Sequence, residues 1–346
     1  MPAPAPSSVR VLAGKYALGR PLGEGAAGTV FEAENLLVGR TVAVKVLPPH
    51  LAVREDLQTA FISEARAAAR VAHANVVEVF DIGLDREGAP FIVMELLAGE
   101  TLMEILESRG PLPLPYAAEL TLQILAAVSA AHEQGIIHRD LKPANVMVTH
   151  PRPDQPLVKV LDFGIAQGLV ASDDEALRCA GTPLYMPPEQ ALGKPLDPRS
   201  DVYSVCAIFY ELVTGRPPFN LDSSEAVLAA SLRGRFTPLA QRVPGVHPVL
   251  AAAIDSGLSA NRNQRPASAA ALSEILGPFA DPIASSRIRR SARSLEPIPL
   301  VCHECAEVAP EPEWQPPPRR GWVAPMLWVV LGFAAGVGVC AGFLSG

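Results

Sequence analysis

The apolar and polar positions of this chain change their period along its length. Apolar residues alternate with polar ones over residues 16–48 and again over 76–98, as expected for half-buried β-strands. Residues 55–70 between them have the apolar spacing of an amphipathic helix. Farther along, the pattern predicts Ala- and Leu-rich helices over 116–134, 198–214 and 247–276, and short strands at NVMV and VKVL.

This order of elements predicts an α+β fold with two lobes. We expect one folded domain over residues 16–280, with a β-rich N-lobe at about 16–98 and a helical C-lobe at about 99–280. Residues 1–15 begin MPAPAPSSVR and have no apolar run of the kind found in a signal peptide. We interpret them as a flexible lead.

A second apolar feature lies near the C-terminus. Residues 322–344 contain no charge, and a helix of this length spans about 34 Å, enough for the hydrocarbon core of a bilayer. The alternative is a buried core helix, although such helices are usually shorter and amphipathic. Arg319 and Arg320 precede the stretch, so the positive-inside rule predicts a single-pass cell-membrane protein with residues 1–320 in the cytoplasm and the C-terminus outside.

Residues 281–320 connect the predicted domain to this predicted transmembrane helix. They are rich in Pro, Ser and charge without apolar periodicity, which is typical of a linker. Cys302 and Cys305 within it are half of a zinc-ligand set, and a closed structural site needs four ligands, so no zinc is expected unless two chains share it. The glycines at 332, 336, 338 and 342 allow a homodimer of membrane helices, but glycine is common in such helices anyway.

Composition limits the class of protein. The chain has 346 residues, of which 49% are hydrophobic, so it is expected to fold. Its formal net charge is −7, and the six Arg after residue 280 are balanced by six acidic residues, so the excess negative charge lies in residues 1–280. This acidic body argues against a nucleic-acid partner. Five scattered Cys favour a reducing compartment.

The first chemical motif is rich in glycine. Gly23-Glu24-Gly25-Ala26-Ala27-Gly28-Thr-Val30 is followed by strand-like alternation and not by a helix, which places the glycines in a hairpin. Such a hairpin lets backbone N–H groups lie over nucleotide phosphates. Lys45 follows on the next strand in Val-Ala43-Val-Lys45, where its ammonium is suited to the α- and β-phosphates. Glu64 of the 55–70 helix is the expected carboxylate that holds it. Glu55 on the same helix is the alternative, but Glu64 lies deeper in the apolar repeat.

The most specific signal is the sequence His138-Arg139-Asp140-Leu-Lys142-Pro-Ala-Asn145, followed by Asp162-Phe163-Gly164. With these two motifs the chain resembles the bacterial eukaryotic-like Ser/Thr protein kinases, from about Tyr16 to Phe279. The resemblance implies a two-lobed protein-kinase-like fold that uses ATP and Mg²⁺, with Mn²⁺ as a substitute. Lys142 is typical of Ser/Thr kinases, as opposed to Tyr kinases.

The resemblance also implies roles for individual residues. Asp140 is expected to be the catalytic base, Lys142 to neutralise the transferred phosphoryl group, and Asn145 and Asp162 to hold Mg²⁺. Met94 is expected to border the adenine site. The adenine itself is expected to bind the backbone of Glu95 and Leu97, on the connection between the lobes. The remaining nucleotide contacts are expected from the glycine hairpin, Ala43 and Lys45.

Further matches concern the activation segment and its support. Residues 181–189 resemble the end that docks the substrate, Glu189 is expected to pair with Arg265, and Asp201 begins a helix that braces the catalytic loop. A lengthened hairpin is expected at 150–156. Pro187 and Cys206 depart from the family's usual Ala and Gly without removing a catalytic group.

The activation segment itself departs from the usual pattern. Between Gly164 and Gly181 its only hydroxyl residue is Ser172, so a phosphorylation switch looks reduced. Residues 173–175 are acidic, and we hypothesise that they partly supply the missing charge. The alternative is that they form a solvated loop and that dimerisation or a partner activates the protein.

The expected function is that of a non-specific serine/threonine protein kinase anchored in the membrane, which phosphorylates cytoplasmic proteins and itself. A membrane-anchored pseudokinase scaffold is the alternative from a different class, and the four intact catalytic positions argue against it. A small-molecule phosphotransferase shares the same catalytic loop, but the segment that ends at Glu189 favours a protein substrate.

Overall fold

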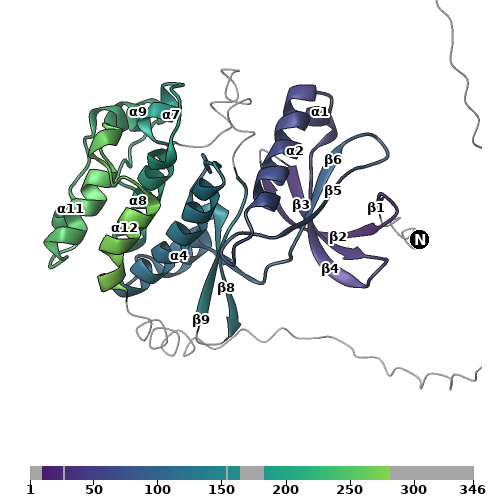
Figure 1. Cartoon of the computed structure of the whole chain (residues 1–346), viewed down its shortest axis with the longest axis horizontal. Coiled ribbons are helices and arrows are strands. Elements are labelled where there is room, and N and C mark those ends of the chain that lie inside the picture. The colour runs from purple at the N-terminus through teal and green to yellow at the C-terminus, as the bar shows by residue number, and fades with distance from the viewer. Residues whose placement is uncertain (1–9, 26–27, 153–154, 164–182, 281–346) are drawn as a thin grey trace, which may run out of the picture. The chain divides into compact units, whose positions relative to one another are not determined.

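The computed structural model describes residues 10–25, 28–152, 155–163 and 183–280. All of them belong to one unit of the chain, Met1–Glu296. Figure 1 shows the two groups of elements in this unit, a β-sheet with two helices and a larger set of helices. The predicted linker (281–320), the predicted transmembrane helix (322–344) and the acidic residues 173–175 lie outside the described residues.

The N-lobe is built on a six-stranded sheet in the order β1-β2-β3-β4-β6-β5. Neighbouring strands in it are antiparallel, and Val44, Phe91 and Val93 are among the side chains that form its core. The strands that we predicted within 16–48 and 76–98 are thus confirmed. Their bounds are β1 (Val11–Leu12), β2 (Tyr16–Gly25), β3 (Gly28–Asn35), β4 (Arg40–Val46), β5 (Val79–Leu84) and β6 (Pro90–Met94).

The start of the domain differs from the prediction. Residues 10–15 were assigned to the flexible lead, but Val11 and Leu12 form β1 and pair with Ala17 and Tyr16 of β2. Leu12 is 2% exposed and belongs to the N-lobe core. A strand of two residues is too short to show a period in the sequence, which is why the pattern missed it.

Two helices follow β4, the short α1 (Pro49–Ala52) and the longer α2 (Glu55–Arg70), whose bounds match the prediction. Leu57, Phe61, Ala65 and Ala68 recur every three or four residues and are all buried. Phe61 and Ala65 pack with Leu47 and Ile92 beside the sheet. Glu64 lies on the same buried stretch of α2 and is therefore carried toward the sheet.

The C-lobe has α8 (Pro198–Thr214) as a buried core helix. Its residues from Ser200 to Leu212 are all buried, Asp197 caps its N-terminus, and Gly215 ends it in a left-handed conformation. The other C-lobe helices are α3 (Leu102–Arg109), α4 (Leu114–Glu133), α7 (Pro188–Ala191), α9 (Ser224–Arg233), α10 (Leu239–Arg242), α11 (Pro248–Gly257) and α12 (Ala269–Leu276), with short 3₁₀ turns at Pro143–Asn145, Arg262–Gln264 and Gly277–Phe279.

The predicted helix over 247–276 is two helices, and the prediction of one continuous helix was wrong. The first ends at Gly257, and the side chain of Asn261 caps a 3₁₀ turn. Pro266 and the capping residue Ser268 then start a new helix. The first helix has therefore ended well before Pro266, and this proline, which lacks the N–H that a helix interior needs, lies within the break while the apolar spacing continues.

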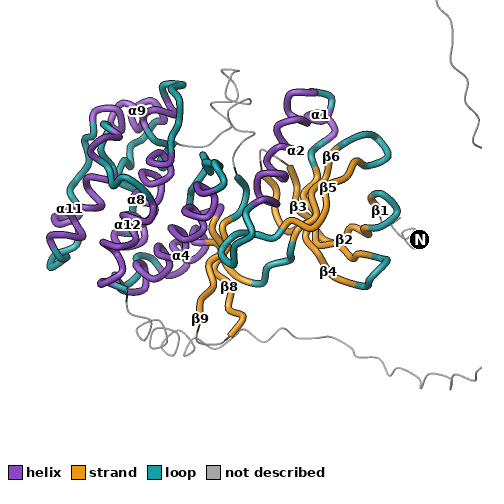
Figure 2. The backbone as a smooth tube through the Cα atoms, viewed as in Figure 1, coloured by secondary structure: helices purple, strands orange, loops and turns teal. Residues whose placement is uncertain are grey.

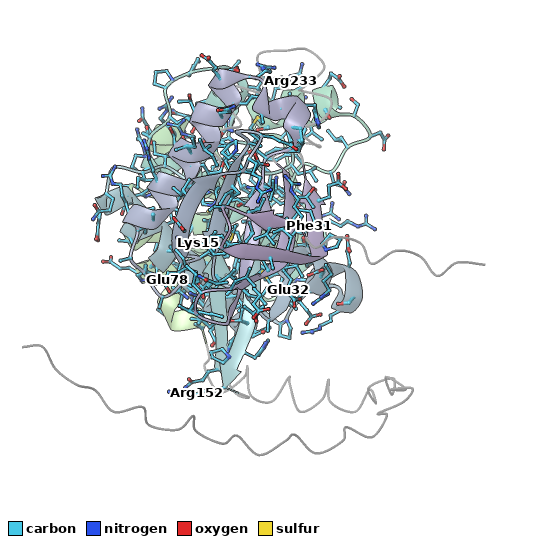
Figure 3. All side chains as sticks on the ribbon, turned by 90° about the vertical axis from the view of Figure 1, so that its right-hand side faces the viewer. Lys15, Phe31, Glu32, Glu78, Arg152 and Arg233 are labelled. Carbon is cyan, nitrogen blue, oxygen red and sulfur yellow. The ribbon has the colours of Figure 1, made fainter. Side chains whose placement is uncertain are left out.

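A three-stranded sheet of β7 (Gly99–Thr101), β8 (Val146–Arg152) and β9 (Gln155–Val160) lies beside these helices (Figure 2). β8 and β9 form a hairpin in which Arg152 is the register partner of Gln155, so the lengthened hairpin expected at 150–156 is present. Arg152 lies at the far end of this hairpin (Figure 3). Residues Pro143–Asn145 lead directly into β8, which fixes the end of the catalytic loop on this sheet.

One helix of the described residues, α4, is long and apolar enough to cross a membrane by length and composition. It contacts α8, α12 and β9, and 56% of its most apolar window is buried inside the fold. These contacts identify α4 as a core helix of the C-lobe.

Candidate functional site

Three charged side chains from separate elements meet at Lys45. Its Nζ lies 3.2 Å from Glu64 Oε1 and 2.9 Å from Asp162 Oδ1. Lys45 comes from β4, Glu64 from α2, and Asp162 from the segment after β9. Lys45 and Glu64 are 4% and 5% exposed, while the Asp162 side chain keeps 40% of its surface exposed. The structure thus brings together the lysine and glutamate that the sequence paired and adds the aspartate.

This cluster holds two carboxylates and one ammonium. Burial lowers the pKa of Lys45, but Asp162 and Glu64 outweigh it and raise that pKa above its usual value, so the ammonium stays charged. Burial raises the pKa of Glu64 to about 7 against the opposing effect of Lys45, and Asp162 adds to the rise. The excess negative charge is a physical reason for a further cation beside Asp162.

The catalytic loop holds Asp140 between two polar side chains. Lys142 Nζ lies 2.8 Å from Asp140 Oδ2, and Asn145 Nδ2 donates to the same oxygen and to the Asp140 carbonyl, both at 2.8 Å. The Asp140 side chain remains 17% exposed. The carboxylate is therefore fixed in orientation while part of its surface stays open to a reacting group.

The catalytic loop is held in place by Asp201 of α8. Asp201 accepts hydrogen bonds from the backbone N–H groups of His138 and Arg139, at 2.9 and 3.1 Å, and lies 2.7 Å from His132 Nε2. Arg139 has a positive φ of 71°, which is unfavourable for a residue with a side chain. The buried Asp201 carboxylate stabilises this backbone and so positions Asp140, as the resemblance implied. The contribution of His132 was missed, because it lies on α4, 69 residues away in the chain.

The two catalytic segments are tied to each other. The Leu161 N–H donates to the Asn145 carbonyl at 2.9 Å, and His138 Nε2 contacts the Leu161 carbonyl at 2.8 Å. The rings of His138 and Phe163 lie 4.7 Å apart, and Phe163 is 1% exposed. These contacts fix Asp162, whose φ is +43°, relative to Asp140 and Asn145.

The donor groups present suit Mg²⁺. The Asn145 side chain uses its nitrogen toward Asp140, and its amide oxygen accepts no hydrogen bond within the described part of the chain. This oxygen and the Asp162 carboxylate are hard oxygen ligands, and Mg²⁺ binds one or two such groups together with substrate phosphates. No cluster of three or more His, Cys, Asp or Glu suited to a metal occurs among the described residues.

The glycine-rich segment forms the predicted hairpin, in which Gly25 of β2 is the register partner of Gly28 of β3. Gly28 has a φ of 132°, and a Cβ on it would lie 2.3 Å from the Val46 carbonyl oxygen. Only glycine therefore fits at this position. Gly23, Glu24 and Val30 belong to the same strands, whereas Ala26 and Ala27 lie outside the described residues.

Replacement of Gly28 by Ala is expected to lower the free energy of unfolding by about 1–3 kcal/mol, because it adds both backbone strain and a clash with Val46. Gly25→Ala is the matched control, since a Cβ there meets nothing within 4 Å and its φ is not positive. Urea unfolding of both variants measures the difference. Equal stability of the two would contradict the assigned role of Gly28.

The connection between the lobes carries the predicted adenine-binding residues. Ala43 is buried and is the register partner of Met94 at the end of β6. The side chain of Glu95 turns back, accepts from the Glu78 N–H at 2.8 Å and lies 2.6 Å from Lys159 Nζ. Glu95 is thereby anchored to β9, and Leu97 two residues farther along is half-buried. The Lys159 contact was missed because 64 residues separate it from Glu95.

The segment that ends at Glu189 is anchored by the predicted ion pair. Arg265 donates from Nη1 and Nη2 to the two Glu189 carboxylate oxygens, at 2.7 and 2.8 Å, and both residues are buried. Ser200 Oγ also donates to Glu189 at 2.7 Å. Gln190, which the sequence did not single out, donates to the Arg139 carbonyl at 3.0 Å and so joins this segment to the catalytic loop.

A second acidic group nearby predicts a pH dependence. Hydrogen bonds from Arg199, then those from Arg262, lower the pKa of Asp197 against the effect of burial. The Asp197 carboxyl group binds a proton more readily in the unfolded chain than in the folded one, so stability rises with pH where this group titrates. The stabilisation from Asp197 is fully present above its ordinary pKa of 3.8 and is lost as the pH falls below that value. The stability difference between the wild type and Asp197→Asn should therefore shrink from pH 6 to pH 3 in urea unfolding. A constant difference would contradict this.

Comparison with known proteins agrees with this geometry. The family model for the protein kinase domain matches residues 16–275, so the chain belongs to the protein kinase family. Serine/threonine-protein kinase pkn3 of Myxococcus xanthus is 42% identical over 269 residues, 76% of this chain and 49% of the relative. Probable serine/threonine-protein kinase CE0033 of Corynebacterium efficiens is 38% identical over 290 residues, 82% and 43% of the two chains. The chain thus spans less than half the length of these curated relatives.

Solved structures give the same family. The PknI kinase domain of Mycobacterium tuberculosis superimposes with a TM-score of 0.62 and 25% identity, covering 80% of this chain and all of that one. Rad53 1-466 in complex with AMP-PNP also gives a TM-score of 0.62 at 25% identity, over 77% of this chain and 66% of that one. The lobes and strands predicted from the sequence are therefore those of a protein kinase.

Proposed function

We propose that this chain is an ATP-dependent serine/threonine protein kinase. The observation that carries the proposal is the arrangement of Asp140 with Lys142 and Asn145, next to an Asp162 carboxylate that contacts Lys45. Phosphoryl transfer needs mainly positioning and neutralisation of charge, and these groups supply both. The names of the relatives support the choice of Ser and Thr over Tyr as acceptors.

Each residue has one task in this mechanism. Asp140 holds the substrate hydroxyl and accepts its proton, and Lys142 offsets negative charge on the transferred group. Lys45, held by Glu64, orients the α- and β-phosphates beneath the glycine hairpin. Asn145 and Asp162 are the residues that would hold Mg²⁺, which supplies further neutralisation of the phosphates when bound. The AMP-PNP bound to Rad53 supports a nucleoside triphosphate as the donor.

Membrane attachment is a further part of the proposal. The uncharged stretch 322–344 and the arginines that precede it support a single-pass anchor with the kinase domain in the cytoplasm. Cytoplasmic proteins and the chain itself are then the substrates within reach, and paired membrane helices would bring two kinase domains together. Fractionation of cells that express the chain, with and without residues 322–344, tests the anchor. Recovery of the intact chain in the soluble fraction would contradict it.

Transfer of label from γ-labelled ATP tests the activity. The full chain in detergent is incubated with Mg²⁺ and a generic basic protein, and the labelled amino acids are identified after hydrolysis. We expect phosphoserine and phosphothreonine, and loss of both in Lys45→Met. Nucleotide binding without any transfer would instead favour the pseudokinase scaffold, which the intact Lys45, Asp140, Asn145 and Asp162 argue against.

A further inference from the structure

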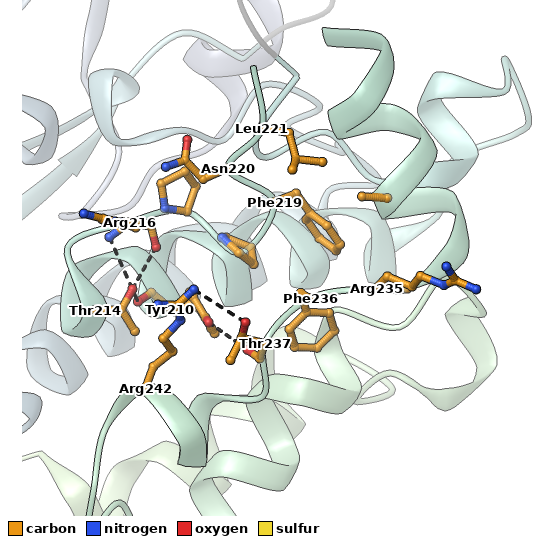
Figure 4. Close-up of a pocket in the computed structure, with 14 residues that line it drawn as sticks. Tyr210, Thr214, Arg216, Phe219, Asn220, Leu221, Arg235, Phe236, Thr237 and Arg242 are labelled. Carbon is orange, nitrogen blue, oxygen red and sulfur yellow. Dashed lines mark hydrogen bonds between the residues drawn. The ribbon is translucent and has the colours of Figure 1, made fainter. Parts of the chain in front are cut away.

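A cavity of about 660 Å³ lies at the C-terminal end of α8 (Figure 4). Its lining comes from the end of α8, the loop that follows it, Ala230 of α9, the segment after α9, and α10. The side chains that matter for its chemistry are Tyr210, Arg216, Phe219, Arg235, Phe236 and Arg242.

The cavity is separate from the phosphoryl-transfer site. Asp201, which holds the catalytic loop, is at the start of α8, and the cavity residues Tyr210 and Thr214 are nine and thirteen positions farther along the helix. At 1.5 Å per residue the distance along the helix is about 14–20 Å. An extended peptide covers this distance with about four to six residues. One protein can therefore reach both places.

The walls are cationic and the floor is aromatic. Arg216, Arg235 and Arg242 are exposed, and none of them forms an ion pair with a carboxylate of the described residues. Arg242 makes one long contact, 3.5 Å to Thr237 Oγ1. The rings of Phe219 and Phe236 pack edge to face, with their centres 5.6 Å apart. Three guanidinium groups without a carboxylate partner in the described part of the chain stand out, because the net charge of the chain is −7.

The positions of the three arginines select the shape of the ligand. In Figure 4 Arg216 and Arg242 lie on one side of the two phenylalanine rings, and Arg235 lies on the other and points away from them. Guanidinium groups on opposite sides of the rings favour an extended ligand over a compact one. An extended segment with several carboxylates reaches both sides and places an apolar side chain against the half-buried Phe236, since Phe219 beneath it is only 2% exposed. Leu221 on the rim is 47% exposed and adds apolar surface for such a segment.

We propose that this cavity is a docking site for an acidic segment of a protein substrate, one that carries an aromatic or leucine side chain between its carboxylates and lies at least about four residues from the phosphorylated Ser or Thr. The proposal rests on the proposed kinase function. It assigns this surface to the choice of substrate and leaves the transfer step to the catalytic loop.

Direct binding of a synthetic peptide tests the proposal independently of catalysis. The probe is fluorescein-labelled Glu-Glu-Phe-Glu-Glu-Leu-Glu, measured by fluorescence anisotropy on the full chain carrying Asp140→Asn. We expect saturable binding that weakens with added salt, and a loss of about five- to ten-fold in affinity in Arg216→Glu and in Arg235→Glu. The matched control is Arg233→Glu, an exposed arginine of α9 that does not line the cavity, and we expect less than a two-fold change.

Three outcomes would overturn the proposal. They are the absence of binding, an equal loss in Arg233→Glu, and equally effective displacement of the probe by inorganic phosphate, which would indicate a site for a small anion. If the probe binds as expected while the wild type transfers no phosphate, the docking site stands and the kinase function fails. With an active enzyme, the cavity variants should raise KM for a substrate that carries the acidic segment and leave kcat unchanged.

Discussion

Replacement of Asp140 by Asn should lower the rate of phosphoryl transfer by about 10²–10⁴-fold, the range expected for loss of a positioned general base. The substitution keeps the size of the side chain and one oxygen that accepts hydrogen bonds from Lys142 and Asn145. What it removes is the ability to accept the proton of the substrate hydroxyl. We therefore expect the loss in kcat, with folding and nucleotide binding nearly unchanged.

Initial rates with γ-labelled ATP measure the effect, and thermal unfolding with and without nucleotide confirms that the variant still folds and binds. Asp222→Asn is the matched control, because Asp222 is exposed and its side chain makes no hydrogen bond within the described part of the chain. Its rate should equal that of the wild type. Activity of Asp140→Asn within ten-fold of the wild type would contradict the assignment of the base.

Replacement of Arg265 by Met should lower the free energy of unfolding by about 3–5 kcal/mol. The variant leaves the Glu189 carboxylate buried without its cation, and it also removes hydrogen bonds to the carbonyls of Ser259 and Arg199. The guanidinium carbon lies 4.9 Å from the centre of the Tyr203 ring, so a packing contact is lost as well.

Arg262 offers a matched control in the same region. It pairs with Asp197 at 2.9 Å, but about a quarter of both side chains is exposed, and Arg199 still pairs with Asp197 when Arg262 is lost. Arg262→Met should therefore cost about 1 kcal/mol or less. Urea unfolding of both variants at pH 7 gives the comparison. A loss below 1 kcal/mol in Arg265→Met would show that the buried pair does not anchor this segment.

Local motifs were the part of the site that could be predicted from the sequence. The glycine hairpin, Lys45 and the segment from His138 to Asn145 are each defined by neighbours in the chain, and their spacing indicates their geometry. The pair Lys45–Glu64 was predicted from the glycine hairpin and the 55–70 helix, the pair Glu189–Arg265 through the family resemblance, and both are present. The strands and the helix over 55–70 followed from their periods.

Contacts between distant segments could not be predicted in this way. The pairing of Glu95 with Lys159 and of His132 with Asp201 depends on how β9, α4 and α8 pack, and no local pattern encodes that packing. The same is true of the cavity beside Phe219, since its arginines come from three separate segments. Apolar spacing also continued through the break at Pro266, because both helices bury a face against the same core.

The segment after α2 belongs to both lobes, and this decides how α2 can move. Asn75 donates from its side chain to the Val158 carbonyl, its own carbonyl accepts from the Val160 N–H, and the Val77 N–H donates to the Val160 carbonyl, at 2.8–3.0 Å. The C-terminal end of α2 is thus followed within five residues by a fixed pivot on β9. Glu64 lies six residues before the end of the helix.

A rigid tilt of α2 about this pivot acts as a lever. Glu64 is about 9 Å from the helix end, so a tilt of ~10° displaces its carboxylate by ~1.5 Å, enough to break the 3.2 Å contact with Lys45. The opposite end at Glu55 travels more than twice as far for the same angle. A ligand that binds at the first turn of α2 therefore acts on the end that moves most and readily separates Glu64 from Lys45. A ligand that binds near Arg70 acts close to the pivot and displaces Glu64 little.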